Sequence, residues 1–234
     1  MAKKSSGGAW LTDFEGVAGG VLFVLYVVVF PLTIHWIFRG IEALLNTSFS
    51  AAREQEIYYY VIFVATLLIF YNFIGKTTRW MFGNFLHTLS TAAVGLVAFY
   101  GLNELLYRVS HTLLGGETNL NDMAISAQTA TVGRPTLLIL IFIAPFVEEV
   151  LFRGYIFGML RPRNRVLAYV ISTLLFAFLH VWQFAAGGFS VQHLVLLMQY
   201  LIPGLVLCWT YDRCATIWCP VLTHVCVNAL SILL

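Results

Sequence analysis

Two adjacent glutamates and an arginine lie within an apolar stretch of this chain. Glu148, Glu149 and Arg153 follow an apolar run that begins near Pro135. Insertion scales put the cost of one such charge at the centre of a bilayer at about 2.5–3.5 kcal/mol. A chain that keeps three of them within one helix-length of apolar sequence is expected to use them. We therefore take this stretch as the centre of both the fold and the candidate site.

The composition excludes an ordinary soluble domain. Hydrophobic residues make up 60% of the 234 positions and charged residues only 10%, whereas soluble domains carry about 25% charged residues. Since only helices or closed barrels satisfy their backbone in lipid, and a helical span needs about 20 apolar residues, the sequence predicts an all-α, polytopic bundle of about seven to eight spans with an internal catalytic cavity. The expected spans are residues 17–38, 57–75, 80–107, 136–160, 166–186, 193–211 and 214–234.

The distribution of lysine and arginine predicts the orientation in the cell membrane. Basic residues accumulate on the cytoplasmic side of short loops. A cytoplasmic N-terminus places eight of them inside and four outside, and the inner set is Lys3, Lys4, Lys76, Arg79, Arg161, Arg163, Arg165 and Arg213. The first apolar run is too long for a signal peptide and is interpreted as a retained span.

The chain is expected to form one membrane domain with two parts. Residues 1–135 are expected to form the N-terminal spans and a long loop, 109–135, which is interpreted as a connector. Residues 136–234 are expected to form the catalytic core.

Polar side chains in two later spans are the natural partners of the glutamates. Residues four apart share a helix face, so Glu149 and Arg153 are expected to form an ion pair and leave Glu148 free. His180 lies deep in the fifth expected span, and His224 and Asn228 share a face of the last. Because such groups turn toward a bundle interior or a wet cavity, one common cavity is predicted. The structural alternative is that these residues only cross-link helices.

A set of this kind is suited to hydrolysis. Glu148 can accept a proton from water as a general base, and His180 can hold the same water. His224 and Asn228 can donate hydrogen bonds to the oxyanion, and one such donor is worth about 2.7–4 kcal/mol in other enzymes. The expected chemistry is general-base attack on a carbonyl without a covalent intermediate.

Other kinds of site find little support. The sequence contains no His-Glu-x-x-His and no Gly-x-Ser-x-Gly, which signal zinc proteases and serine hydrolases. No aspartate lies inside an expected span. A zinc site built from Glu148, His180 and His224 remains open, although no cofactor is expected. The other cysteines and histidines are interpreted as free buried thiols and as structural or interfacial side chains: Cys208, Cys214, Cys219, Cys226, His35, His87, His111 and His193.

The order and spacing of these residues resemble a known family. Glu148-Glu149-x-x-x-Arg153, then Phe176-x-x-x-His180, then His224-x-x-x-Asn228 are similar to the three motifs of the CPBP family, which comprises CAAX proteases and bacteriocin-processing enzymes and is also called Abi or Rce1-like. The resemblance covers about residues 136–232. Each motif is weak alone, but three in this order are specific.

The resemblance implies a glutamate-dependent intramembrane endopeptidase. In it Glu148 and His180 activate water, His224 and Asn228 form the oxyanion hole, and Glu149 and Arg153 support the site. The implied substrate is a membrane-associated peptide or protein, in the eukaryotic branch a prenylated one that loses the last three residues of its CAAX end. No nucleic-acid partner is indicated, and the oligomeric state is open.

Two alternatives from other classes remain. One is a non-proteolytic membrane adaptor or immunity protein that binds a sensor kinase or a bacteriocin-like peptide. The other is a transporter with Glu148 as proton carrier, which the lack of inverted-repeat character disfavours. Because Glu148 is close in sequence to Arg161, the substrate is expected to approach from the inner face.

Overall fold

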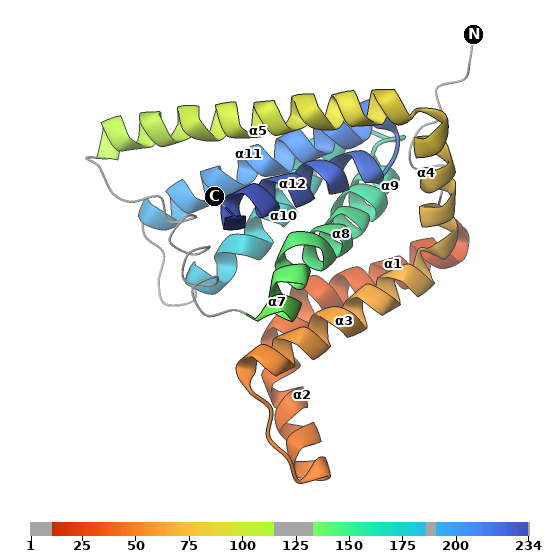
Figure 1. Cartoon of the computed structure of the whole chain (residues 1–234), viewed down its shortest axis with the longest axis vertical. Helices are drawn as coiled ribbons and strands as arrows, with labels where there is room; N and C mark the ends of the chain where they lie inside the picture. Colours follow the sequence, from red (N-terminus) through yellow and green to blue (C-terminus); the bar gives the residue numbers. More distant parts are fainter. Residues whose placement is uncertain (1–10, 115–132, 186–190, 234) are drawn as a thin grey trace.

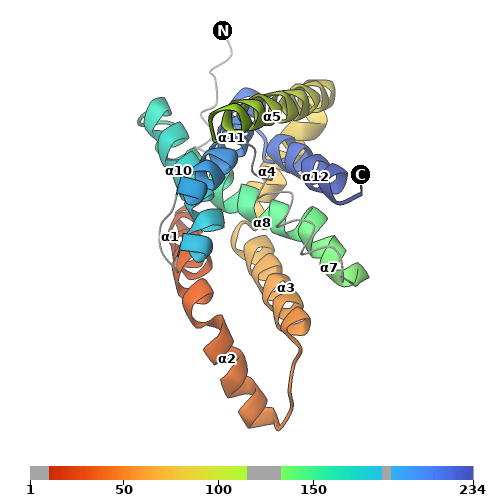
Figure 2. The same cartoon turned by 90° about the vertical axis from the view of Figure 1, so that its left-hand side faces the viewer.

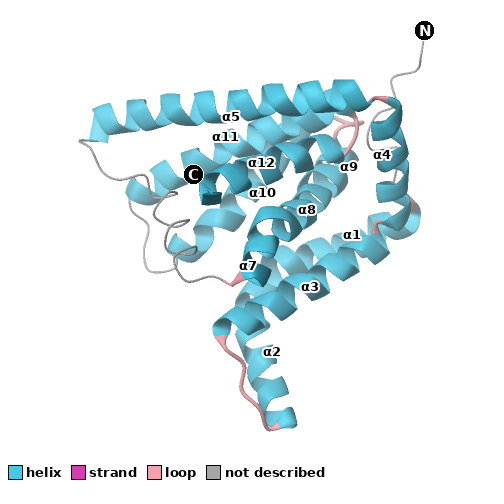
Figure 3. Ribbon diagram, in the orientation of Figure 1, coloured by secondary structure: helices cyan, strands magenta, loops and turns pink. Residues whose placement is uncertain are grey.

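Helices account for all the regular structure in the part of the chain that the structure describes. The structure is a computed structural model, which describes residues 11–114, 133–185 and 191–233. In these ranges no strand occurs, which confirms the all-α prediction (Figure 3). Large apolar side chains are exposed around the outside, for example Trp36, Leu44 and Leu86. An apolar outer surface of this kind suits lipid contact, so the protein is a multi-pass membrane protein.

The N-terminal helices form an antiparallel pair. α1 (Asp13–Val24), the π-helical η2 (Leu25–Val29) and α2 (Phe30–Leu45) run on without interruption. Asn46, with φ 50°, ends α2 in the left-handed conformation, and the side chain of Ser50 caps α3 (Ala51–Ile69). α3 then bends by 78° into α4 (Tyr71–Gly83). The pair projects beyond the rest of the molecule at the α2–α3 connection (Figure 2).

The stretch that carries the two glutamates is the central helix of the molecule. It comprises α7 (Arg134–Leu138), η3 (Ile139–Ile143), α8 (Ala144–Glu149), η4 (Val150–Phe157) and α9 (Gly158–Leu160). In its most apolar window 67% of the residues are buried, against 22–33% in the three other long apolar helices. α10 (Arg165–Ala185), α11 (Val191–Cys214) and α12 (Trp218–Leu233) surround it together with α1 and α3.

The long helix α5 (Phe85–Leu114) closes the opposite side. It packs on α11 and α12, whereas α1 and α3 lie across the molecule from it, with α8 between the two layers (Figure 1). The principal core cluster therefore joins N-terminal residues such as Phe70 and Phe73 to Phe152 of the central helix and Ile217 near α12. Both regions named in the domain prediction contribute to this one core.

The predicted spans coincide with helices, but fewer of them are long enough to cross a membrane. Among the described residues, four helices meet the requirement of length and apolarity: Asp13–Leu45, Phe85–Arg108, Arg134–Leu160 and Arg165–Trp182. The bent pair of α3 and α4 provides a fifth, and α12 is apolar but shorter. The prediction of seven to eight spans exceeds this count, because α11 does not meet the requirement and α12 is too short. The expected span 57–75 contains the bend at Phe70, which the sequence pattern does not reveal. The predicted loop is also shorter, since α5 continues to Leu114; residues 115–132 and 186–190 lie outside the described residues.

The arginine-rich turn after α9 fastens three helices at one end of the bundle. Asp212 near the end of α11 accepts from Arg161 Nε at 2.6 Å and from Arg165 Nη2 at 2.6 Å. Burial raises the pKa of Asp212, but the hydrogen bonds and charges of the two arginines outweigh burial and hold that pKa below its ordinary value. This end of the molecule is the one predicted to face the cytoplasm, and the orientation stays a prediction.

A buried carboxylate holds the sharp bend between α3 and α4. Glu15 is fully buried, and its Oε2 accepts from the backbone N–H of Thr12 at 2.7 Å. Its Oε1 accepts from the backbone N–H of Phe73 at 2.7 Å, a donor that the bend leaves near the start of α4. Gly154 of the central helix lets this turn come close, because a Cβ there would lie 2.8 Å from the Phe73 ring.

Substituting Glu15 by glutamine should destabilise the fold. The amide keeps only one acceptor oxygen, so one buried backbone donor loses its partner, at a cost of about 1–3 kcal/mol. Unfolding of the purified protein in mixed micelles measures this loss. The control is Glu104→Gln, which removes an exposed ion pair with Arg108 and should change stability by about 0–1 kcal/mol. Equal stability of the two variants would contradict the assigned role of Glu15.

Candidate active site

The two adjacent glutamates lie between two π-helical segments of the central helix. η3 ends just before α8, and η4 begins just after Glu149. π-helical turns widen the backbone ladder and are frequent at functional sites. Glu148 and Glu149 are both buried, with relative exposures of 7% and 0%. Successive side chains on a helix point in different directions, and the two carboxylates accordingly have different partners.

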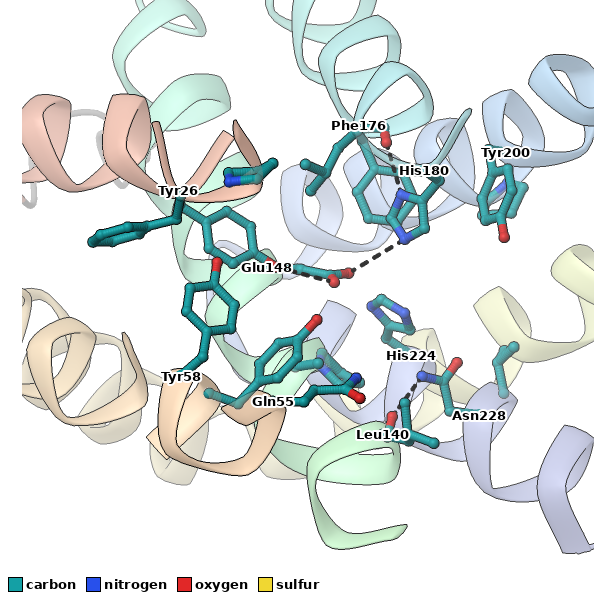
Figure 4. A pocket seen from close by; sticks show the side chains of 18 of the residues that line it. Tyr26, Gln55, Tyr58, Leu140, Glu148, Phe176, His180, Tyr200, His224 and Asn228 are labelled. Carbon is teal, nitrogen blue, oxygen red and sulfur yellow. Dashed lines mark hydrogen bonds and ion pairs between the residues drawn. The ribbon is translucent and has the colours of Figure 1, made fainter. Parts of the chain in front are cut away.

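Glu148 faces the interior cavity and has one contact on each oxygen. Its Oε2 lies 3.9 Å from Nε2 of His180 on α10. Its Oε1 accepts a hydrogen bond of 3.3 Å from the hydroxyl of Tyr26 on η2 (Figure 4). The separation from His180 is too long for a direct hydrogen bond. Tyr26 therefore fixes one oxygen, and the other points toward the imidazole.

The hydrogen bond on the far side of His180 defines its tautomer. Nδ1 lies 2.8 Å from the backbone oxygen of Phe176, and a carbonyl oxygen can only accept. Nδ1 therefore carries the proton, and Nε2 of the neutral ring presents a lone pair toward Glu148. The ring also stacks on Tyr200, with centroids 4.5 Å apart. Two acceptors on either side of a 3.9 Å gap can both receive a hydrogen bond from one water molecule.

Glu149 points away from this gap and forms a buried network. Its Oε1 accepts from Arg153 Nη1 at 2.8 Å and from His224 Nδ1 at 2.8 Å. This confirms the predicted ion pair of Glu149 with Arg153. Arg153 also donates to the backbone oxygen of Gly204 at 3.3 Å and lies 4.3 Å above the ring of Phe176. The network thus joins the central helix to α10, α11 and α12.

His224 and Asn228 present two further groups to the same cavity from α12. Because Nδ1 of His224 bonds to a carboxylate, its Nε2 is the free ring nitrogen, and it donates only when the ring is protonated. Asn228 Nδ2 donates to the backbone oxygen of Leu140 in η3 at 2.8 Å. An amide nitrogen carries two hydrogens, so one remains for another acceptor. The shared face predicted for this pair is present.

The cavity between these helices has a volume of about 640 Å³. Glu148, His180, His224 and Asn228 line it, together with residues from α2, α3, α5 and α11. Its lining reaches the first turn of α3 and the last turns of α12. It does not include the arginine-rich turn after α9. The approach of the substrate from the inner face stays a prediction.

The predictions about a metal site, the cysteines and the remaining histidines have different outcomes. Among the described residues, no group of three histidine, cysteine, aspartate or glutamate side chains could hold a metal ion; metal independence itself stays a prediction. The four cysteines are free, but Cys226 is exposed where a buried thiol was expected. His87 lies 3.4 Å from the backbone oxygen of Arg213, and the side chains of His111 and His193 lie outside the described residues.

The structure adds residues that the sequence reasoning did not select. Tyr26 comes from the first helix, and Tyr58 and Tyr59 of α3 line the cavity near it, as do Gln199 and Tyr200 of α11. No motif marks the N-terminal helices in the sequence. The signal that could have identified these residues is the run of three tyrosines at 58–60 within an apolar span, because a buried phenol needs a hydrogen-bond partner.

Comparison with known proteins agrees with the motif resemblance. Residues 131–230 match the family model described as type II CAAX prenyl endopeptidase Rce1-like. This part of the chain is similar to that family, and we refer to residues 131–230 as the Rce1-like region. The expected family resemblance is thereby confirmed, and the matched range contains all six predicted site residues. Tyr26 and α3 lie outside the Rce1-like region.

Two curated relatives match a similar length of chain. The "UPF0177 protein YxdF" of Lactococcus lactis subsp. lactis is 35% identical over 104 residues, which is 40% of this chain and 52% of that protein. The "Putative membrane peptidase YdiL" of Bacillus subtilis is 29% identical over 93 residues, 39% of this chain and 34% of that protein. The chain thus matches about half of the first relative and a third of the second. No solved structure matches it significantly.

Tyr26→Phe tests whether the N-terminal helices contribute to the site. The ring is buried and stays in place without its hydroxyl, so the fold should be retained. Glu148 loses the hydrogen bond from the Tyr26 hydroxyl, and peptide hydrolysis should fall about tenfold, mainly in kcat. Tyr58→Phe, which removes a nearby phenol hydroxyl, is the matched control and should retain most activity. Full activity of Tyr26→Phe would show that the hydroxyl does not position Glu148.

Proposed function

We propose that this protein is an intramembrane endopeptidase in which Glu148 and His180 activate a water molecule. The observation that carries the proposal is the pair of acceptors, Glu148 Oε2 and His180 Nε2, 3.9 Å apart at the wall of a cavity of about 640 Å³. The Rce1-like match and the relative named as a membrane peptidase support the same activity.

The first step is attack on the peptide carbonyl. A water held by Glu148 and His180 gives one proton to the Glu148 carboxylate while its oxygen forms a bond to the carbonyl carbon. The carbonyl π electrons move to oxygen and give a tetrahedral oxyanion. The hydroxyl of Tyr26 keeps the carboxylate turned toward His180. No bond to the protein is formed.

The oxyanion is stabilised from α12. When its ring is protonated, His224 can donate from Nε2, while its Nδ1 is held by Glu149 Oε1 at 2.8 Å. Asn228 can donate through the amide hydrogen that Leu140 does not use. Donors fixed in place before the reaction need little reorganisation, and one is worth about 2.7–4 kcal/mol. Arg153 positions this pair indirectly by holding Glu149.

Collapse of the intermediate completes the hydrolysis. The electron pair returns from the oxyanion to form the new carboxyl group, and the carbon–nitrogen bond breaks. Glu148, protonated in the first step, returns its proton to the leaving nitrogen. The products are a carboxylic acid and an amine, and Glu148 is again ionised for the next turnover.

The substrate in this proposal is a peptide or protein at the membrane. The cavity combines the polar groups above with apolar residues such as Phe30, Ile34 and Phe99, and the surrounding helices are apolar outside. The family resemblance adds prenylated CAAX-type ends to the substrate classes for testing. We also infer a cytoplasmic N-terminus from the basic residues. The reaction needs no cofactor.

Glu148→Gln is the decisive variant. The amide keeps the shape of the side chain but cannot accept the water proton, so kcat should fall by about 10²–10⁴-fold. The measurement is cleavage of quenched fluorescent peptides, with and without a farnesyl group, by purified protein in detergent or liposomes. Glu104→Gln, on an exposed stretch of α5, is the control and should leave the rate unchanged. If Glu148→Gln retains its biological effect in cells, the protein acts as a membrane adaptor instead.

Treatment with a chelator tests the absence of a metal. Because the proposed water is held by Glu148 and His180, EDTA or 1,10-phenanthroline should leave the rate within about twofold of its untreated value. Metal analysis of the purified protein provides a second measurement. Loss of activity with chelator, restored by added zinc, would instead support the zinc site built from Glu148, His180 and His224.

A further inference from the structure

The charged side chains on the described cavity wall are all carboxylates. Among the described lining residues, the two carboxylates are Glu54 and Glu148, and no lysine or arginine is present. The nearest buried cation of the central network, Arg153, does not line the cavity, since Glu149, Gly204 and Phe176 enclose it. The cavity therefore carries negative charge and no permanent positive charge, and its other polar groups are neutral hydroxyls, amides and imidazoles.

The lack of a permanent cation on the cavity wall limits which chemical groups of a substrate can bind in the cavity. A carboxylate that leaves water must find a cation or several donors, or it is bound at a large cost. The wall also holds neutral donors, such as the hydroxyl of Tyr58, but no permanent cation that could neutralise a carboxylate. The donors His224 and Asn228 lie at the proposed oxyanion site. A second carboxylate would compete with the reacting oxygen for these donors and would be repelled by Glu148.

Glu54 provides a charged acceptor where the first turn of α3 lines the cavity. It lies in the first turn of α3, four residues and therefore one helical turn before Tyr58. Its neighbour Arg53 pairs with Glu56 at 3.4 Å. Within the described residues Glu54 takes part in no ion pair. A basic or other donor side chain of a bound peptide is its natural complement.

Gln199 adds an acceptor on the facing wall of α11. Its side-chain Oε1 is buried without a hydrogen-bond partner in the described structure, and the residue lines the cavity. One turn later Pro203 lacks the N–H that would otherwise reach the backbone oxygen of Gln199. Buried acceptors normally have a donor. The backbone N–H groups of a bound peptide are donors of the required kind.

We propose that the cavity selects an internal, carboxylate-free peptide segment with neutral or basic side chains, and discriminates against a free C-terminal carboxylate close to the cut bond. The inference rests on the proposed protease function and narrows its substrate class. A CAAX end would place its terminal carboxylate three residues beyond the cut, inside this acceptor-lined space. An internal segment, or one with an amidated end, brings no such charge.

Matched peptides test the selection directly. One quenched peptide that is cleaved in a Glu148-dependent manner is prepared with a C-terminal amide and with a free acid three residues after the mapped cut. The amide should be cleaved with at least about tenfold higher kcat/KM. Equal or faster cleavage of the free acid would overturn the inference and leave the protease function intact.

A charge reversal at Glu54 tests the position of the selecting group. A peptide with lysine on the side that faces Glu54 should be cleaved faster than the same peptide with glutamate, and Glu54→Lys should reverse this order. Glu104→Lys, a reversal of charge remote from the cavity, should leave the order unchanged. A preference that neither Glu54→Lys nor Glu54→Gln alters would overturn the assignment to Glu54.

Binding separates this inference from the catalytic one. The His180→Ala variant keeps the Glu148 carboxylate but removes the second partner of the proposed water, so its turnover should be slow enough for fluorescence anisotropy to measure its affinity for the amide and for the free acid. Tighter binding of the amide is expected even if the purified protein cleaves nothing, an outcome that would overturn the protease proposal alone. Equal binding of both peptides would overturn the selection.

Discussion

The buried hydrogen bonds to a single oxygen of Glu149 connect most of this structure. Arg153 and His224 both donate to that oxygen at 2.8 Å, and Arg153 reaches on to Gly204. Removing one member would leave a buried charge without its partner, which is strongly destabilising. The central helix is therefore held in register with α11 and α12, and the rest of the site depends on that register.

With Glu149 engaged, its neighbour Glu148 is turned toward the cavity. Tyr26 bonds to one oxygen and His180 faces the other. The hydrogen bond from His180 to Phe176 leaves the lone pair of Nε2 directed at the same place. Two adjacent carboxylates of identical chemistry thus acquire different tasks: one stabilises the assembly of helices, and the other is available for proton transfer.

The N-terminal helices contribute residues to the cavity that the Rce1-like region lines from the other side. They supply Tyr26 and the α3 wall of the cavity, although the matched residues are 131–230. Their geometry depends on Glu15, which holds the turn between α3 and α4 against the central helix. Glu54, at the other end of α3, adds a second carboxylate to the cavity wall. Substrate selection in this protein is therefore expected to reside partly outside the region that carries the motifs.

The sequence by itself determined the helical class, the apolar character and the six polar residues at the site. Spacing settled the pairing of Glu149 with Arg153 and the common face of His224 and Asn228, because these relations are local to one helix. Only the tertiary structure decided the bend at Phe70, the contact of Tyr26 with Glu148 and which helices line the cavity. These depend on which helix faces oppose each other. That choice is made by packing between residues far apart in the chain, such as Glu15 with Phe73 and Tyr26 with Glu148, which periodicity along one helix does not encode.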